Sequence, residues 1–360
     1  MPREVSVSLD QFFRPQPGGI ATYVRGLIKG LSSLSNESFQ LTGIVPAGTP
    51  RQPLDDLRVR TASATLPVGL LTRAWAHWAI GVPATSEVVH ATSLAGPYRG
   101  GSSHAVHSLA LHDLLWRDEP DTSTPRGIRF HEARLAMLRR REDVRVIVTA
   151  PGLRERLIAE GFASSRLHES RFGVDDDDVV PESAQRVAAL LGEYGVQGPY
   201  TLYAGTREPR KNLDRLVAAH ARARAVHEEL GPLVVVGPPG WGSVELGESI
   251  VLGEVSRAML KGLLRESSVV AYVPRAEGFG LPPVEALHQG ARVVASATTP
   301  SVAHNSTVVV VDAMDVADIE AGLEFALTLP TGQSARDQRR ASVANLTWRN
   351  AALDHVASWR

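Results

Sequence analysis

Two glutamates in the last third of the chain carry the clearest chemical pattern in the sequence. Glu277 and Glu285 lie eight positions apart, and the residues between them are Gly-Phe-Gly-Leu-Pro-Pro-Val. Carboxylates accept hydrogen bonds from hydroxyl groups, and glycine allows a ligand to approach the backbone closely. These residue types at this spacing predict a site for a molecule with both hydroxyls and phosphates, such as a nucleotide sugar.

The elements expected around this segment would position it for phosphate binding. An apolar run at 268–273 predicts a buried strand, and Pro282-Pro283 favours the start of a helix, expected over 282–289 with Gly290 as its C-cap. Because a helix N-terminus presents unpaired N–H groups, the amides of Gly280 and Leu281 are expected to bind phosphate.

The two acids would then have different roles. Glu285 lies about one turn inside the expected helix, where it can accept hydrogen bonds from a ribose diol. Glu277 follows the strand and would face the group attached beyond the phosphates. A side chain larger than glycine at position 278 or 280 would block the approach of the phosphate.

The order of motifs along the chain resembles that of a known family. The run Glu-Gly-Phe-Gly-Leu-Pro-x-x-Glu at 277–285 has three companions: Gly18-Gly19 before a helix, His112-Asp113 after a strand, and the segment from Tyr203 to Asn212. Together they resemble the signature of the retaining group 1 glycosyltransferases of GT-B fold, which include glycogen synthases and bacterial mannosyltransferases. The resemblance implies a nucleoside-diphosphate sugar as donor substrate, no cofactor, no metal, and donor contacts from Gly278, Phe279, Gly280 and Leu281.

The resemblance also assigns roles around Lys211. A lysine at this place and an arginine a few residues earlier contact the diphosphate in the family, which implies Lys211 and Arg207 here. The family's arginine often follows the strand glycine directly, where this chain has Thr206, which we include in the predicted donor site. Arg210 is an alternative to Arg207, although a surface ion pair with Glu208 is its favoured interpretation. Such cations can stabilise the negative charge of a leaving diphosphate.

In the first half of the chain, the same resemblance points to two dipeptides. Gly18-Gly19 implies a backbone that approaches the leaving diphosphate; by itself this pair would only indicate a turn. His112, expected at the end of a strand, is implied to lie against the donor sugar, although a lone histidine there is more often a buried structural group. Asp113 is expected to orient His112 or to bind the acceptor.

Composition excludes several classes of protein. The 360 residues are 43% hydrophobic and 21% charged with a formal net charge of −1, which disfavours nucleic acid as a partner. The absence of cysteine excludes disulfides and thiolate metal sites and is compatible with the cytoplasm. We expect neither a secretory signal nor a membrane span, because the first residues are polar and no run reaches about 20 apolar residues. The expected location is cytoplasmic, with peripheral contact to the inner face of the membrane as an option.

Short apolar runs alternate with helical patterns through both halves, which predicts an α/β protein with parallel sheets. We expect strands at 5–9, 41–45, 88–91, 105–111, 144–149, 200–204, 233–236, 269–273, 293–295 and 308–311. The predicted fold is GT-B: a Rossmann-like acceptor domain over 1–174 and a Rossmann-like donor domain over 175–340, facing an interdomain cleft. A final helix within 341–360, with Trp348, Leu353, Val356 and Trp359 as its apolar positions, is expected to cross back to the first domain.

Three segments leave alternatives open. Four aspartates at 175–178 suggest either a metal site or a solvated turn, and the turn is favoured. The basic stretch 126–141 predicts a helix that contacts anionic lipid or, as we favour, packs Ile128, Leu135 and Leu138 on the sheet with its cations in solvent. Trp75 and Trp78 could line an acceptor groove or pack in the core.

The predicted function is metal-independent, retaining transfer of a hexose of the mannose, rhamnose or glucose class to an acceptor hydroxyl, in glycan or glycoconjugate synthesis. The acceptor could be a carbohydrate or a lipid-linked glycan, and the sequence does not distinguish the base of the donor. Two alternatives belong to other classes: an epimerase or phosphorylase of the same fold, and a non-catalytic nucleotide-sugar-binding protein. The oligomeric state is not predicted.

Overall fold

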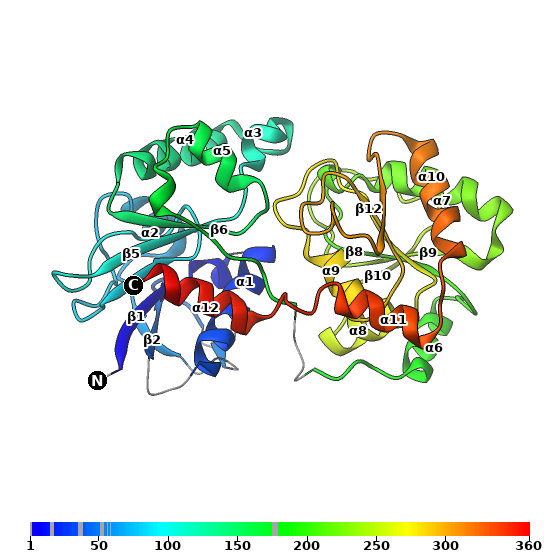
Figure 1. Cartoon of the computed structure of the whole chain (residues 1–360), viewed down its shortest axis with the longest axis horizontal. Coiled ribbons are helices and arrows are strands. Elements are labelled where there is room, and N and C mark those ends of the chain that lie inside the picture. The colour runs from blue at the N-terminus through cyan, green and yellow to red at the C-terminus, as the bar shows by residue number, and fades with distance from the viewer. Residues whose placement is uncertain are drawn as a thin grey trace. The chain divides into compact units, whose positions relative to one another are not determined.

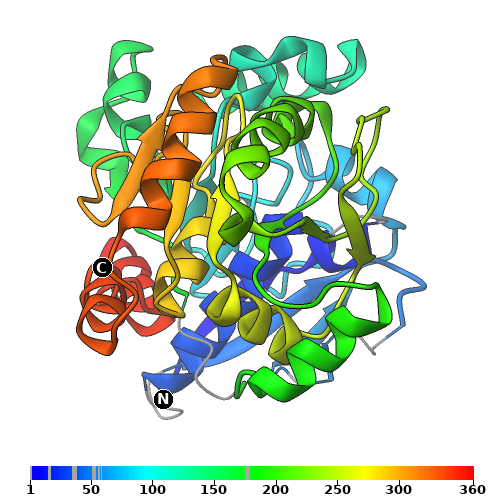
Figure 2. The same ribbon diagram turned by 90° about the vertical axis from the view of Figure 1, so that its right-hand side faces the viewer.

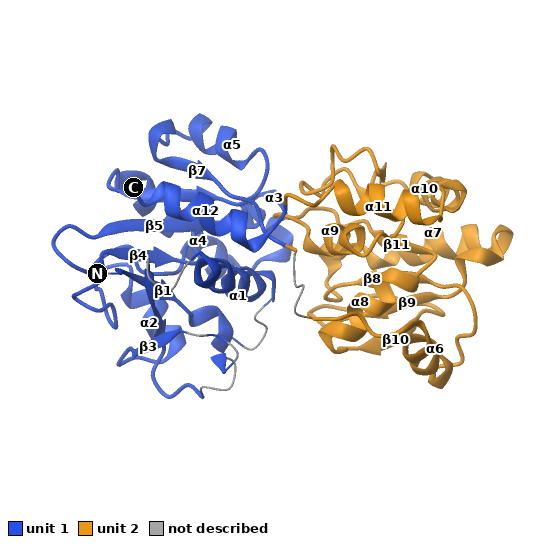
Figure 3. Cartoon of the chain, turned by 60° about the horizontal axis from the view of Figure 1, so that its bottom comes forward, with its two compact units in different colours: residues 1–173, 346–360 blue, residues 174–345 orange. Residues whose placement is uncertain are grey.

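The chain folds into two compact α/β units. The computed structural model describes residues 2–14, 18–34, 39–50, 54–55, 57, 59–174 and 179–360. Unit 1 comprises residues 1–173 and 346–360, and unit 2 comprises residues 174–345 (Figure 3). The predicted boundary at 174/175 therefore lies one residue from the observed division, while the last 15 residues group with unit 1. The aspartates at 175–178 and the loop residues 15–17 lie outside the described residues.

Unit 1 is built on a parallel sheet with strand order β3-β2-β1-β4-β5-β6-β7. Its strands are β1 (Arg3–Ser8), β2 (Phe39–Val45), β3 (Arg60–Ser63), β4 (Val88–Ala91), β5 (Val106–Leu111), β6 (Val144–Val148) and β7 (Leu167–Glu169). Parallel strands need crossover connections, which is why helices separate most of them.

Helices cover both faces of this sheet (Figure 1). Leucines of α4 (Pro125–Arg140) and α5 (Leu153–Ala159) pack on β5 and β6 on one face, and α1 (Gly18–Ser33) and α12 (Trp348–Ser358) pack together on the other. The shorter helices are α2 (Val68–Ala74) and α3 (Leu115–Asp118). The α4 helix confirms the predicted packing, since Leu135 and Leu138 are buried and Ile128 packs against them.

Unit 2 has the parallel order β10-β9-β8-β11-β12-β13. Its strands are β8 (Thr201–Ala204), β9 (Leu233–Val236), β10 (Ile250–Gly253), β11 (Val269–Tyr272), β12 (Val293–Ser296) and β13 (Val308–Val311). On one face α7 (Leu213–Val226) and α10 (Val316–Thr328) pack on the strands; α9 (Leu281–His288) contacts β11 and β12, and α8 (Arg257–Glu266) packs against α9 (Figures 1 and 2). The remaining helices are α6 (Ala184–Glu193), which contacts α8, and α11 (Gln333–Ala341), which contacts α9.

All ten predicted strands are present, and the three that were not predicted, β3, β7 and β10, lie at sheet edges. Two of them, β3 and β7, have few apolar residues, because an edge strand has one unpaired side and fewer buried positions. In β3, for example, Arg60 and Ser63 are exposed and the two residues between them are only half-buried. The third, β10, was missed although it contains the apolar run Ile250–Leu252. Among the described helices, none is long and apolar enough to cross a bilayer.

The last helix, α12, packs directly on the backbone of α1. A Cβ atom on Gly30 would lie 2.1 Å from the carbonyl oxygen of Trp348, and one on Gly26 would lie 2.0 Å from the Trp348 indole. Trp359 is fully buried, but Leu353 is 42% exposed, so its predicted place on the apolar face is wrong. The buried face instead combines the small residues Ala351, Ala352 and Ser358 with Trp348, His355 and Trp359.

Tyr23 of α1 lies at the centre of a buried polar network that joins α12 to the sheet. Its hydroxyl contacts His90 Nε2 at 3.0 Å and His355 Nε2 at 2.7 Å, and its ring packs edge-on against His112. Burial lowers the pKa of all three histidines, to about 4 for His112 and His355. The positive charges that protonated His355 and His112 would carry depress the pKa of His90 further.

These histidines predict that unit 1 loses stability on mild acidification. In the unfolded chain they titrate near pH 6.5, so below that pH the unfolded state binds more protons than the folded state. The stabilisation is fully present above pH 6.5 and declines as the pH falls towards 4, at about 1.4 kcal/mol per pKa unit for each histidine. Urea unfolding between pH 7 and 4.5, followed by tryptophan fluorescence, should show the loss; a constant unfolding free energy over this range would contradict it.

Candidate functional site

In unit 2, the loops that follow the neighbouring strands β8 and β11 bring the predicted donor residues together. Lys211 Nζ lies 2.5 Å from Glu277 Oε2, and Arg210 Nη1 lies 3.1 Å from Glu277 Oε1. The Tyr272 hydroxyl donates to Glu277 Oε2 and accepts a hydrogen bond of 2.5 Å from Lys211 Nζ. We call Arg210, Lys211, Tyr272 and Glu277 the acid–base cluster.

The acid–base cluster keeps Glu277 ionised. Burial alone would raise the pKa of Glu277, but the charges of Lys211 and Arg210 and the hydrogen bonds from Lys211 and Tyr272 lower it to about 2. Burial also lowers the pKa of Lys211, although the carboxylate opposes this. Glu277 is thus a fixed anion between two cations, suited to accepting hydrogen bonds rather than to proton transfer near neutral pH.

The expected surface ion pair of Arg210 needs correction. Arg210 does lie 3.5 Å from Glu208, but its side chain is only 14% exposed and its closer partner is Glu277, so it is not a surface ion pair. Lys211 ends a 3₁₀ turn, and Asn212 has a left-handed backbone with φ 62° before α7 begins. The Asn212 amide donates to the carbonyls of Val273 and Ala313, which fixes the turn that presents Lys211.

Arg207 remains available for a ligand. The Nε of Arg207 is buried without a hydrogen-bond partner. In the described ranges, Arg207 forms no ion pair with a carboxylate. The neighbouring residue Thr206 is fixed by a 2.8 Å hydrogen bond that its carbonyl accepts from the Tyr203 hydroxyl. A buried guanidinium nitrogen without a partner carries a desolvation cost that an anionic ligand would relieve.

The start of α9 has the expected form. Gly280 has φ +90°, and a Cβ there would lie 2.4 Å from Thr299 Cγ2, so glycine is required on both grounds. Phe279 is buried beside it, and Gly278 donates to Glu277 Oε1 at 3.3 Å. Since Pro282 and Pro283 lack N–H groups, the donors at this helix end come from Gly280 and Leu281. The helix begins one residue earlier than predicted, at Leu281, and Gly290 follows its end with φ 78°.

Glu285 points to a partner that was not predicted. Its Oε1 lies 2.8 Å from Arg257 Nη2 at the first residue of α8, and its side chain is 11% exposed. Nothing in the spacing of the sequence connects positions 257 and 285, since only the packing of α8 on α9 brings them together. The ribose contact of Glu285 stays a prediction, with Arg257 positioned to hold its carboxylate.

In unit 1, His112 is a buried, neutral side chain at the end of β5. Its Nε2 lies 2.8 Å from the Thr92 carbonyl, which can only accept, so this nitrogen carries the proton. Its Nδ1 accepts from the Thr149 hydroxyl at 3.0 Å. With a pKa of about 4 and both nitrogens occupied, His112 can contact a sugar through its ring but is not set up to transfer a proton. Asp113 accepts a 3.0 Å hydrogen bond from the Leu115 amide with its Oδ1.

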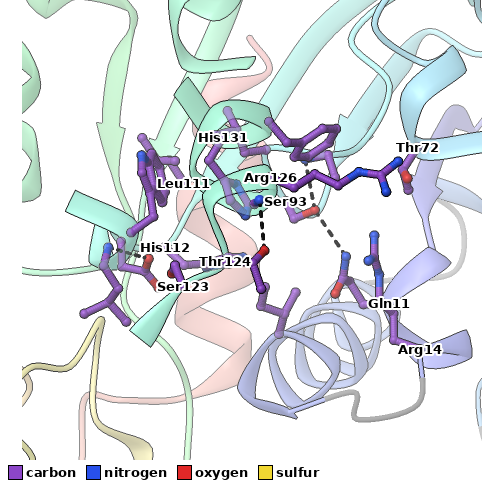
Figure 4. A pocket seen from close by; sticks show the side chains of 18 of the residues that line it. Gln11, Arg14, Thr72, Ser93, Leu111, His112, Ser123, Thr124, Arg126 and His131 are labelled. Atoms are coloured by element: carbon purple, nitrogen blue, oxygen red, sulfur yellow. Dashed lines mark hydrogen bonds between the residues drawn. The ribbon is translucent and has the colours of Figure 1, made fainter. Parts of the chain in front are cut away.

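A pocket of about 610 Å³ opens beside His112 and Asp113 within unit 1 (Figure 4). Residues that follow β1, β4 and β5 form its floor, as expected for a ligand site at the carboxyl ends of parallel strands. The start of α4 and residues of α2 form its walls. Gly18 and Gly19 are exposed at the start of α1, and a Cβ on either would meet no atom within 4 Å. Their predicted contact with the diphosphate therefore stays a prediction.

The two tryptophans of the 70–80 segment differ in burial. Trp75 is fully buried and donates to the Ile80 carbonyl at 2.9 Å, whereas Trp78 is 62% exposed.

Arg134 of α4 does not lie on the solvated face, because it is buried and donates to the carbonyls of Leu94 and Gly96. Membrane contact through the exposed arginines of α4 stays a prediction. No group of three or more His, Asp or Glu side chains within the described ranges has a metal-site arrangement.

A known protein family matches the part of the chain that contains these unit 2 residues. The family description "Glycosyl transferases group 1" matches residues 195–343, which contain the acid–base cluster and α9. The chain is 28% identical over 269 residues to the serotype-specific mannosyltransferase WbdA of Escherichia coli, a match that covers 68% of this chain and 32% of the relative. The chain thus spans about a third of the length of that curated relative.

Solved structures agree with the fold over both units. A sucrose-phosphate synthase from Thermosynechococcus elongatus superposes with a TM-score of 0.73 at 18% identity, covering 99% of this chain and 98% of the other. The Anabaena protein HepE in complex with UDP and glucose superposes with a TM-score of 0.65 at 14% identity, covering 99% and 95%. The fold is GT-B, as predicted, and residues 195–343 match the group 1 glycosyltransferase domain.

Proposed function

We propose that this protein transfers a hexose from a nucleoside-diphosphate sugar to an acceptor hydroxyl with retention of the anomeric configuration. The observation that carries the proposal is the acid–base cluster at the carboxyl ends of β8 and β11. It lies beside the start of α9, where Gly280 precedes the helix. The names of the relatives favour mannose, and the HepE complex shows a related fold that holds UDP and glucose.

In the proposed reaction, the bond between the anomeric carbon and the diphosphate oxygen breaks as the acceptor oxygen attacks from the same face. The acceptor proton passes to the leaving diphosphate. Arg207, Lys211 and the amides of Gly280 and Leu281 stabilise the developing negative charge, without a metal ion or other cofactor. Glu277 accepts hydrogen bonds from the sugar hydroxyls, Glu285 holds the ribose, and the ring of His112 supports the electron-poor sugar.

The proposal predicts donor turnover that withstands EDTA. The purified chain, incubated with GDP-mannose, UDP-glucose, ADP-glucose or dTDP-rhamnose, should release the nucleoside diphosphate of one donor, slowly as hydrolysis without acceptor and faster with it. NMR of the transferred sugar should show the anomeric configuration of the donor.

Three outcomes would count against the proposal. Activity that disappears with EDTA and returns with Mg²⁺ would contradict the role given to the side-chain cations. Inversion at the anomeric carbon would contradict retention. Binding of all donors without release of nucleotide would favour a non-catalytic binding protein, and a bound pyridoxal chromophore would favour a phosphorylase.

A further inference from the structure

We propose that the unit 1 pocket recognises an acceptor that carries a phosphate group, held by Arg14, Arg73 and Arg126 at a distance from the attacking hydroxyl. This inference rests on the proposed function and names the chemical class of its acceptor. All three arginines line the pocket, and Asp113 is the single carboxylate among the described residues that line it. The pocket wall is therefore strongly cationic in a chain whose formal net charge is −1.

The arginines are poorly neutralised by the protein itself. No carboxylate pairs with Arg73 or Arg126 in the ranges that the structure describes. Arg14 forms an ion pair of 3.5 Å with Asp10, which is fully buried. The Nε of Arg14 is itself buried without a hydrogen-bond partner. An anionic ligand would supply the missing acceptors.

The surroundings of His131 in the pocket are positively charged as well. Its ring stacks on Trp116 at 4.8 Å and lines the pocket, and its buried Nδ1 has no hydrogen-bond partner in the described part of the chain. The pKa of His131 is lowered first by burial and then by the charge of Arg14. Burial together with this cationic surrounding disfavours further positive charge and favours an anion.

The position of the charges within the pocket fits a phosphorylated sugar. Figure 4 shows His112 at one side of the pocket and Arg14, Gln11 and Thr72 at the other, with the side chain of Arg126 extending towards Thr72. Arginine binds phosphate oxygens in a bidentate manner, and three guanidinium groups suit a doubly charged ester. An acceptor could thus place its phosphate among the arginines while its hydroxyl lies near His112.

The test compares mannose 6-phosphate with mannose as acceptor-site probes. Binding to the full chain is measured by ligand-observed NMR with saturating GDP present, so that the diphosphate site in unit 2 is filled. We expect mannose 6-phosphate to bind at least about tenfold more tightly than mannose, and Arg73→Ala/Arg126→Ala to remove about that factor, as for lost charged hydrogen bonds. Arg129→Ala is the matched control, because Arg129 is exposed on the same helix but does not line the pocket.

A second arm separates free from lipid-linked phosphate. Sedimentation with phosphatidylcholine vesicles containing one fifth phosphatidylinositol is compared with phosphatidylcholine alone, for the wild type and the same variants. Preference for the soluble phosphate supports a free phosphorylated sugar; vesicle binding that depends on Arg73 and Arg126 supports a lipid-borne phosphate.

The inference is overturned if neither form binds, if mannose binds as well as mannose 6-phosphate, or if GDP abolishes binding of the probe. The shift of the His131 ring signals on adding mannose 6-phosphate to the wild type tests the same point without any variant. Hydrolysis of the donor without acceptor, measured in parallel, shows whether the proposed function stands when this inference fails.

Discussion

Replacing Lys211 by alanine is expected to lower turnover of the donor by about a hundredfold or more, the scale of losing one preorganised electrostatic contact. The Lys211 ammonium is 8% exposed and sits 2.5 Å from Glu277, so its position is set before a ligand arrives. Without it, the leaving diphosphate loses a fixed cation and Glu277 loses one of its two cationic partners. Release of nucleoside diphosphate under single-turnover conditions measures the loss.

Glu277→Ala should cause a similar loss of turnover, because it leaves two cations in the cluster without their shared carboxylate. If Lys211 and Glu277 act as a unit, the double variant will be little worse than the poorer single variant. Additive losses would show that the two side chains act separately. Arg222→Ala, which removes a cation that is 60% exposed on α7, is the matched control and should keep normal turnover.

Gly30→Val is expected to destabilise unit 1 by about 3 kcal/mol or more, at the upper end of overpacking effects. The added Cβ would lie 2.1 Å from the Trp348 carbonyl oxygen and 2.7 Å from its carbonyl carbon, so the obstacle is backbone that cannot rotate away. The helices α1 and α12 must then separate, which removes Trp348 and Trp359 from their buried sites. Hydrogen exchange should show the protection of residues 346–360 falling before that of unit 2.

Gly192→Ala is the control for this prediction. Gly192 also lies in a helix, α6, but a Cβ there would meet no atom within 4 Å. Alanine should therefore raise stability slightly, by up to about 1 kcal/mol, through helix propensity. Equal effects of the two substitutions on the unfolding free energy would show that the close approach of α12 to α1 does not matter.

The sequence predicted those parts of the fold whose residues repeat a local pattern. Inner strands such as β9 and β12 are continuous apolar runs. The prolines at the start of α9 and the glycine after its end predict both ends of the helix to within one residue. The edge strands β3 and β7 lack such runs, and β3 is mostly polar. Leu353 was placed on the buried face by its helical spacing, but the face of α12 that is buried contains Trp348, Ala351, Ala352 and His355. Which face is buried depends on the surface of another helix, where Gly26 and Gly30 make room for Trp348.

The candidate site shows the same division. Glu277, Lys211 and Gly280 could be identified because the motif is contiguous or lies at strand ends. Tyr272 lay within the predicted strand 269–273 without a predicted role, because its hydroxyl meets Lys211 and Glu277 only in the folded unit. The contact of Arg257 with Glu285, and the burial of nitrogens of Arg14 and His131 without a hydrogen-bond partner, result from tertiary packing. A single sequence carries no signal for such contacts.

The return of residues 346–360 to unit 1 makes unit 2 an insertion within unit 1. A chimera that joins unit 1 of this chain to the donor half of a relative by a single junction at 173/174 would leave the surface of α1 uncovered, with Trp348 and Trp359 lost. An exchange of donor specificity should instead transplant residues 174–345 as a cassette with two junctions, so that the host keeps its own closing helix.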